Sequence, residues 1–296
     1  MPSVAAWLLA RPQNAVLALA VAMLMPGLAI FSGAVLLMIV LQQDLRRAGL
    51  VAGLASVILL LAAVIVGSSP WRVLLQVALM WLPILGFAQV MRVTRSLTLA
   101  LQLTVIFVIF GAALFMVLMN DPVAFWQQVI ATDPLLENLR ASLQEWQTAL
   151  GATDLQFAGI MTTMYAIGFW FGLVIVITAG YWLYQQVPGN SPDFGRFRDL
   201  NFGRVIAVLL VVTSVAGFIS SAVWIQIVAV VLFAAFWLQG AAFAHWLRAA
   251  GKLPVFGVAA VYALTVVLPQ YVFTAVAVIG YTDAWFDFRS RVPRQQ

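Results

Sequence analysis

Long uncharged apolar stretches follow one another along almost the whole chain, and they constrain the fold more than any other feature. A helix needs about 20 residues to cross roughly 30 Å of hydrocarbon, and most of the stretches have about that length or more. Backbone groups that face lipid must be paired within their own segment, so we expect helices. The sequence therefore predicts an all-α, polytopic transmembrane helix bundle with about eight hydrophobic segments. These are residues 14–41, 48–67, 73–91, 97–119, 156–184, 205–220, 222–247 and 254–280.

The composition requires lipid as part of the solvent. Of the 296 residues, 64% are hydrophobic and 8% are charged, whereas a soluble domain has about half apolar and about a quarter charged residues. We therefore expect residues 1–296 to form a single integral membrane domain with the bilayer as its partner. The net charge of +5 does not predict nucleic-acid binding, because the arginines stand at the ends of apolar stretches. The absence of cysteine excludes disulfides and thiolate sites.

The charges between the stretches predict which side of the membrane each loop occupies. The insert at 120–155 carries five acids against the single Arg140, so we expect it outside the cell. Alternating the spans from this insert places all the multiply basic loops on the other side, in the cytoplasm, as the positive-inside rule requires. These loops contain Arg46 with Arg47, Arg92 with Arg95, the basic residues of the longer loop 185–204, and Arg248 with Lys252. The chain is thus expected to cross a bacterial inner membrane several times.

The acidic insert has helical signals of its own. Asp121-Pro122 and Asp133-Pro134 each place a capping acid before a proline, which is typical of a helix start. Leu139, Leu143, Trp146 and Leu150 then recur at helical spacing up to Gly151. This pattern predicts an amphipathic helix that caps the bundle, with a lid or docking element as the alternative.

Prolines interrupt the first and the last stretch near their middles. Pro26-Gly27 and Pro269 would divide each stretch into two short helices and return both chain ends to the cytoplasm. We expect this break in the first stretch; in the last, the sequence leaves a broken pair and a single span both open. Gly49 and Gly53 match a G-x-x-x-G pattern and are expected to be close-packing positions.

The apolar stretches contain no Asp, Glu, Lys or Arg. Proton-coupled carriers generally need such a carboxylate within the membrane, and His245, the sole histidine, cannot form a two-histidine metal site. We therefore expect no enzyme, no cofactor and no metal. Solute binding is then expected from neutral groups, although helix–helix hydrogen bonding accounts for the same residues. The candidates are Gln89, Gln239, Tyr262 and Gln270, with His245 at the rim.

The C-terminal tail at 281–296 mixes aromatic residues with charges of both signs. This composition suits an interfacial helix, which is either a stop-transfer anchor or a docking element for a protein partner. Asp287 and Arg291 have the spacing of an ion pair. The candidate partner contacts are Asp283, Trp285, Asp287, Arg289 and Arg291.

Several short motifs resemble the YybS-like family of uncharacterised bacterial membrane proteins. They are the tail, Leu238-Gln239-Gly240 running to His245, and Pro192-x-Phe194-x-x-Phe197-Arg198. The early run from Pro26-Gly27 to Ser32-Gly33, followed by Arg46-Arg47-x-Gly49-x-x-x-Gly53, is similar to the first three helices of that family. More distantly, the chain resembles the S components of ECF-type vitamin transporters and the cell-shape protein MreD. The resemblance implies an S-component-like bundle.

Two functional interpretations follow. The first is a transporter-related membrane subunit that binds a small solute without its own energy coupling and works with separate energising subunits. Its support is the pair of broken stretches, since Gly/Pro-interrupted segments at corresponding positions indicate a binding site within the membrane. The alternative is a non-transporting, MreD-like scaffold or assembly protein that contacts envelope machinery through the tail and the outer helix.

Overall fold

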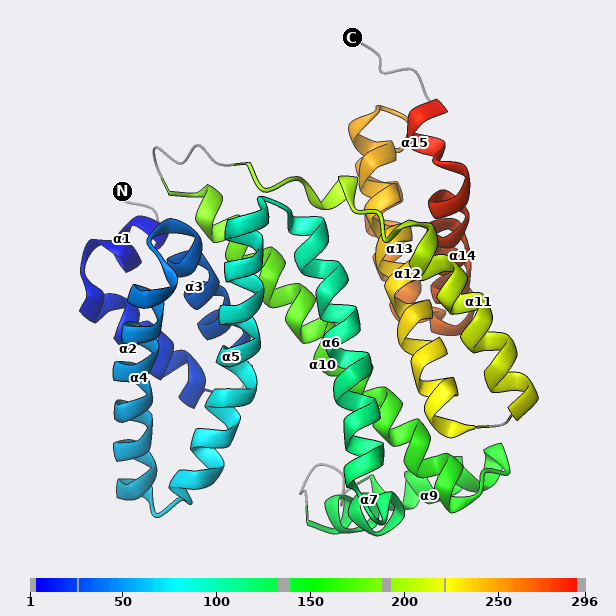
Figure 1. The fold of residues 1–296 in the computed structure, drawn as a ribbon, viewed down its shortest axis with the longest axis horizontal. Coiled ribbons are helices and arrows are strands. Elements are labelled where there is room, and N and C mark those ends of the chain that lie inside the picture. The colour runs from blue at the N-terminus through cyan, green and yellow to red at the C-terminus, as the bar shows by residue number, and fades with distance from the viewer. Residues whose placement is uncertain (1–3, 26, 133–138, 188–192, 221, 292–296) are drawn as a thin grey trace. The chain divides into compact units, whose positions relative to one another are not determined.

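The computed structural model describes residues 4–25, 27–132, 139–187, 193–220 and 222–291. Within these residues the regular structure is entirely helical and forms an all-α polytopic bundle, which confirms the predicted fold class (Figure 1). The chain forms two compact units. Unit 1 comprises Met1–Thr104 and Phe171–Phe197, and unit 2 comprises Val105–Trp170 and Arg198–Gln296.

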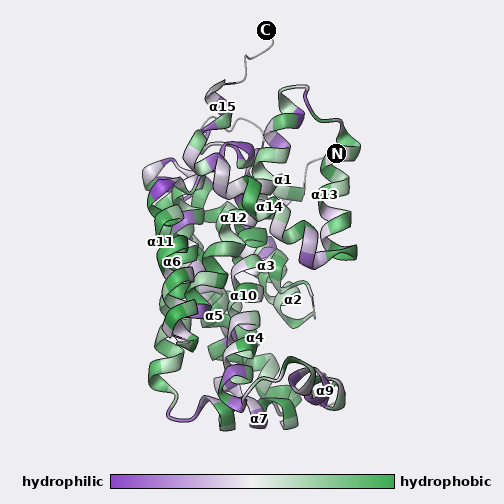
Figure 2. Cartoon of the chain, turned by 90° about the vertical axis from the view of Figure 1, so that its right-hand side faces the viewer, coloured by the Kyte–Doolittle hydropathy of each residue, from purple (hydrophilic) through white to green (hydrophobic). Residues whose placement is uncertain are grey.

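Six described helices are long and apolar enough to cross a membrane, so the chain is a multi-pass membrane protein. Many of their large apolar side chains are exposed, Ile65 by 84% and Phe218 by 89%, as expected for surfaces that face lipid. Figure 2 shows hydrophobic residues along these helices and a mostly hydrophilic α9. The six are α4 (Leu45–Val66), α5 (Pro70–Thr94), α6 (Leu97–Leu118), α10 (Asp154–Gln185), α11 (Gly203–Ser220) and α12 (Val223–Ala249).

The first apolar stretch forms two helices, α2 (Pro12–Leu24) and α3 (Ala29–Gln42). Gly27 lies between them with φ +82°, a conformation that glycine adopts without steric cost, while Pro26 is outside the described residues. The Ser32 hydroxyl donates to the Leu19 carbonyl oxygen at 3.2 Å, so α3 folds back against α2. A further helix, α1 (Val4–Ala10), meets α2 at 116°.

Helix α3 is the core of unit 1. Every residue from Ser32 to Leu41 is buried, which requires neighbours on all sides of a helix too short to face lipid alone. Glycines allow the second part of α10 to approach it. A Cβ atom on Gly180 would lie 2.7 Å from the Ala34 carbonyl oxygen, and one on Gly33 would lie 2.8 Å from a methyl group of Val176.

Helix α12 is the core of unit 2. In its most apolar 18-residue segment 72% of the residues are buried, whereas the corresponding segments of the other five long helices are 17–39% buried. The helices α11, α13 (Val255–Val267) and α14 (Pro269–Phe286) pack around it. The closest approach is between Gly240 of α12 and Gly280 of α14. A Cβ atom on Gly280 would collide with the Phe236 carbonyl oxygen and lie 2.5 Å from the Gly240 nitrogen.

The last apolar stretch is also two helices, which answers the question that the sequence left open. Helix α13 ends at Val267 and α14 begins at Pro269, the first helical position that a proline tolerates. Helix α14 leads into α15 (Phe288–Arg291), where the Arg289 guanidinium donates to the Arg198 carbonyl oxygen at 2.7 Å. The end of α14 thus lies beside the start of α11. We call this end of unit 2 the basic end, because it carries Arg198, Arg204, Arg248 and Lys252.

The insert lies at the other end of unit 2 (Figures 1 and 2). It contains α7 (Pro122–Thr132), whose predicted cap is confirmed by a 2.9 Å hydrogen bond from the Ala124 amide to Asp121. The predicted amphipathic helix is α9 (Arg140–Leu150), which ends at Gly151 with φ +60°. The second predicted start, at 133–134, lies outside the described residues.

The prediction of close packing at Gly49 and Gly53 is wrong. A Cβ atom built at either position meets no atom within 4 Å. The spacing alone does not decide the contact, because the same G-x-x-x-G ridge forms whether or not another helix crosses it.

Candidate functional site

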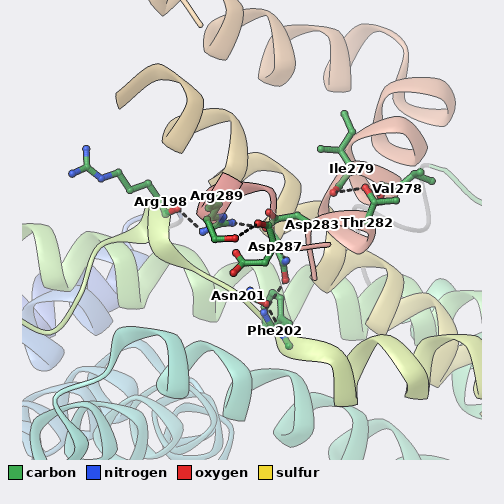
Figure 3. A network of polar contacts seen from close by, with 12 residues as sticks. Arg198, Asn201, Phe202, Val278, Ile279, Thr282, Asp283, Asp287 and Arg289 are labelled. Atoms are coloured by element: carbon green, nitrogen blue, oxygen red, sulfur yellow. Dashed lines mark hydrogen bonds and ion pairs between the residues drawn. The ribbon is translucent and has the colours of Figure 1, made fainter. Parts of the chain in front are cut away.

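Unit 2 contains a buried polar network at its basic end (Figure 3). Asp283 lies on α14 with no solvent-exposed surface. One oxygen of its carboxylate, Oδ2, is 3.0 Å from Arg289 Nη2 and accepts a hydrogen bond from the Gln239 amide nitrogen at 3.1 Å. Charged residues are rarely fully buried unless paired, and here the partners come from α15 and α12.

Both partners of Asp283 also bind the backbone that leads into α11. The Gln239 carbonyl oxygen accepts from the Phe202 amide at 2.7 Å. Arg289 donates to the Arg198 carbonyl oxygen, and its guanidinium lies 5.9 Å from the centre of the Phe243 ring. The network therefore links α12, α14, α15 and residues 198–202, and we call this set of contacts the clamp.

The second carboxylate oxygen of Asp283, Oδ1, is buried and has no hydrogen-bond partner among the described residues. A group in this state is destabilising by itself, but its net charge is balanced by Arg289 at 3.0 Å. Through these contacts the network fixes the positions of the helices that it links.

The predicted partner-contact residues differ in their burial and in their contacts. Helix α14 extends six residues past the last apolar stretch, which ends at residue 280. Asp283 is therefore inside α14 and pairs with Arg289 instead of facing outward. Trp285 has a buried indole nitrogen, and its carbonyl oxygen accepts from Arg204 at 3.4 Å. Asp287 is exposed and ends α14 with φ +45°. The side chain of Arg291 lies outside the described residues.

The predicted solute-binding residues do not gather in one place within unit 2. His245 Nε2 lies 3.0 Å from the Tyr262 hydroxyl, so this pair does meet. Gln239 belongs to the polar network, and Gln270 is exposed in the first turn of α14. Gln89 lies on α5 in unit 1, where its side-chain oxygen is buried and the part of the chain that the structure describes offers it no hydrogen-bond partner.

A second site lies in the insert, where α7, α9 and α10 enclose a cavity of about 330 Å³. This volume suits a small organic molecule. Its floor belongs to an apolar cluster that includes Trp126, Ile130, Phe157 and Ala158, and Leu143 of α9 closes it from the side. The Trp126 indole donates to the Thr162 hydroxyl at 2.9 Å, which fixes the ring against α10.

The rim of this cavity is polar. Gln127, Gln144, Gln147, Arg140 and Asp154 line it. Gln147 donates to Asp154 Oδ1 at 2.8 Å, which joins α9 to the start of α10. The described residues provide Arg140 with no ion pair. The cavity thus combines an aromatic floor with amide and charged groups that remain accessible.

This cavity was not predicted from the sequence, which indicated a capping helix with a lid or docking element as the alternative. A signal was present in the insert, because four glutamines, three of which line the cavity, and two tryptophans fall within about 25 residues. Their convergence depends on how α7, α9 and α10 fold together, and the periodicity of one helix does not contain that information. Among the described residues, no group of three or more His, Asp or Glu side chains forms a metal site.

No protein-family model, curated protein or solved structure matches this chain. The resemblance to YybS-like proteins therefore stays a prediction, and the fold and the two sites of unit 2 carry the functional inference.

Proposed function

We propose that this multi-pass membrane protein is a transporter-related subunit that binds a small solute in the cavity between α7, α9 and α10. The observation that carries the proposal is the cavity itself, about 330 Å³ with an aromatic floor and a polar rim. Pockets for small molecules combine mostly apolar walls with a few polar groups that orient the ligand, and this one has that composition.

Separate energising subunits are part of the proposal. Asp283 is the one buried acid among the described residues, and Arg289 and Gln239 already hold it. A carboxylate that exchanges a coupling ion must be able to change its partner, whereas this one belongs to a clamp between helices. The chain is thus expected to bind solute without driving its accumulation, in the inner membrane of a bacterium.

Blocking the cavity tests the proposal. Gln144 lines the cavity, and its neighbour Glu145 on the same helix does not. Gln144→Trp should fill the opening, while Glu145→Trp adds the same indole outside it. Native mass spectrometry of gently purified protein should show a bound solute of a few hundred daltons on the wild type and on Glu145→Trp.

Gln144→Trp should lose that solute. Equal retention by both variants would place any bound molecule elsewhere and reject the cavity. No bound solute on the wild type, together with a stably co-purifying envelope protein, would favour the scaffold function instead.

A further inference from the structure

The cavity in the insert contains more information about its ligand than size alone. Its floor is formed by rings that are almost fully buried, Trp126 at 5% exposed and Phe157 at 8%. Ile130 and Ala158 continue this apolar surface. Flat apolar walls favour a ligand whose body is itself flat and apolar, because stacking on aromatic rings adds to the burial of apolar surface.

Two charged residues of opposite sign line the cavity, so its lining is neutral overall. Arg140 is the first residue of α9, and Asp154 is the first residue of α10. The described residues provide no ion pair for either of them. Arg140 therefore keeps its guanidinium donors for a planar acceptor such as a carboxylate.

Asp154 retains an oxygen as well. Gln147 donates to Oδ1, and among the described residues no hydrogen bond reaches Oδ2. This second oxygen is available to a donor such as an ammonium group. A ligand with a single charge would satisfy one of the two residues and leave the other facing a group of its own sign.

We infer that the cavity binds a zwitterion, a molecule with one carboxylate and one ammonium group on a flat apolar body about the size of an aromatic ring. Arg140 binds the carboxylate, Asp154 the ammonium, and Trp126 and Phe157 contact the body. The inference rests on the proposed function, since it names the class of solute for the same cavity.

Three matched probes test the ligand class with the full-length protein in lipid nanodiscs. L-phenylalanine carries both charges, 2-phenylethylamine lacks the carboxylate, and 3-phenylpropanoate lacks the ammonium. Dissociation constants can be measured by ligand-observed NMR titration. The wild type should bind L-phenylalanine at least tenfold more tightly than either singly charged probe.

Two variants should remove one preference each. Arg140→Gln should bind L-phenylalanine and 2-phenylethylamine equally well. Asp154→Asn, which keeps an acceptor for Gln147, should bind L-phenylalanine and 3-phenylpropanoate equally well. Glu145→Gln, outside the cavity on the same helix, should leave all three affinities within twofold of the wild type.

The outcomes separate this inference from the proposed function. Equal affinity for the three probes, or a co-purifying solute that is not zwitterionic, overturns the ligand class while the Gln144→Trp result still decides whether the cavity binds a solute. Failure of all three probes to bind also overturns the class. Absence of any solute on the wild type, together with failure of all three probes to bind, overturns both.

Discussion

The two ends of unit 2 use the same three types of side chain in opposite ways. At the basic end, Arg289 and Gln239 both bind Asp283, which has no exposed surface. In the insert, Gln147 binds Asp154, whereas the described residues give Arg140 no ion pair, and the described charged residues are exposed. A closed set of partners holds helices together, whereas an open set is available to a ligand. The residue types do not distinguish a clamp from a binding site; their burial and pairing do.

The largest expected difference between the two ends is their side of the membrane. A cysteine at Gln144 in the insert should react fully with a membrane-impermeant thiol reagent in spheroplasts, because the acidic insert is predicted to be outside. A cysteine at Lys252, at the basic end, should react only after the membrane is permeabilised. The chain has no native cysteine, so labelling reports these positions alone. The opposite pattern would reverse the predicted topology.

Breaking the closed network should have the largest effect on stability. Arg289→Gln leaves the Asp283 carboxylate buried without its counter-ion, which costs about 3–5 kcal/mol in comparable sites. The free energy of unfolding in mixed micelles measures this loss. Asp283→Asn combined with Arg289→Gln should recover at least half of it, since no buried charge is left unpaired.

The exposed Arg248 at the same end provides the control. Arg248→Gln should change the free energy of unfolding by less than about 0.5 kcal/mol. If Arg289→Gln lowered the free energy of unfolding no more than this control does, the network would not hold the helices together as its contacts indicate.

A smaller loss is expected from overpacking between α12 and α14. Gly280→Ala places a methyl group against the Phe236 carbonyl oxygen, which cannot rotate away as a side chain does. Overpacking of this kind costs about 1–3 kcal/mol. Gly49→Ala is the matched control, because its Cβ atom meets open space. Thermal denaturation in detergent should lower the Tm of Gly280→Ala by several degrees and leave that of Gly49→Ala within about one degree.

Substitution of a charged residue at the cavity in the insert should have the smallest effect on stability. Arg140→Gln removes an exposed cation that has no ion pair among the described residues, so the free energy of unfolding should stay within about 0.5 kcal/mol of the wild type. The same substitution should change ligand preference at the cavity. A large loss of stability would show that Arg140 has a structural partner and would weaken the contrast between the two ends.

Helices and their interruptions could be predicted from the sequence because both depend on local chemistry. Uncharged length defines the six long spans, and Pro269 begins α14 because a proline cannot continue the preceding helix. The cap at Asp121 follows from the same local reasoning. Sequence patterns of this kind determine where helices begin and end.

The partners of particular side chains could not be predicted in the same way. Asp283 was assigned to the tail because a charge marks the end of an apolar stretch. A second helix that begins at Pro269 reaches about 27 Å only if its 18 residues continue to Phe286. The broken stretch therefore implies a longer helix that includes Asp283. That Gln239 and Arg289 would meet this acid depends on tertiary packing alone.

The break between α13 and α14 also constrains how these two helices lie in the membrane. At 13 residues, α13 is about 20 Å long and cannot cross roughly 30 Å of hydrocarbon alone. It must therefore lie in the bilayer together with α14, with which it forms a packed hairpin. Without that hairpin, Gln239 of α12 lacks the acid that accepts its amide hydrogen bond. Closure of the polar network around Asp283 therefore requires α14 to be in place beside α12.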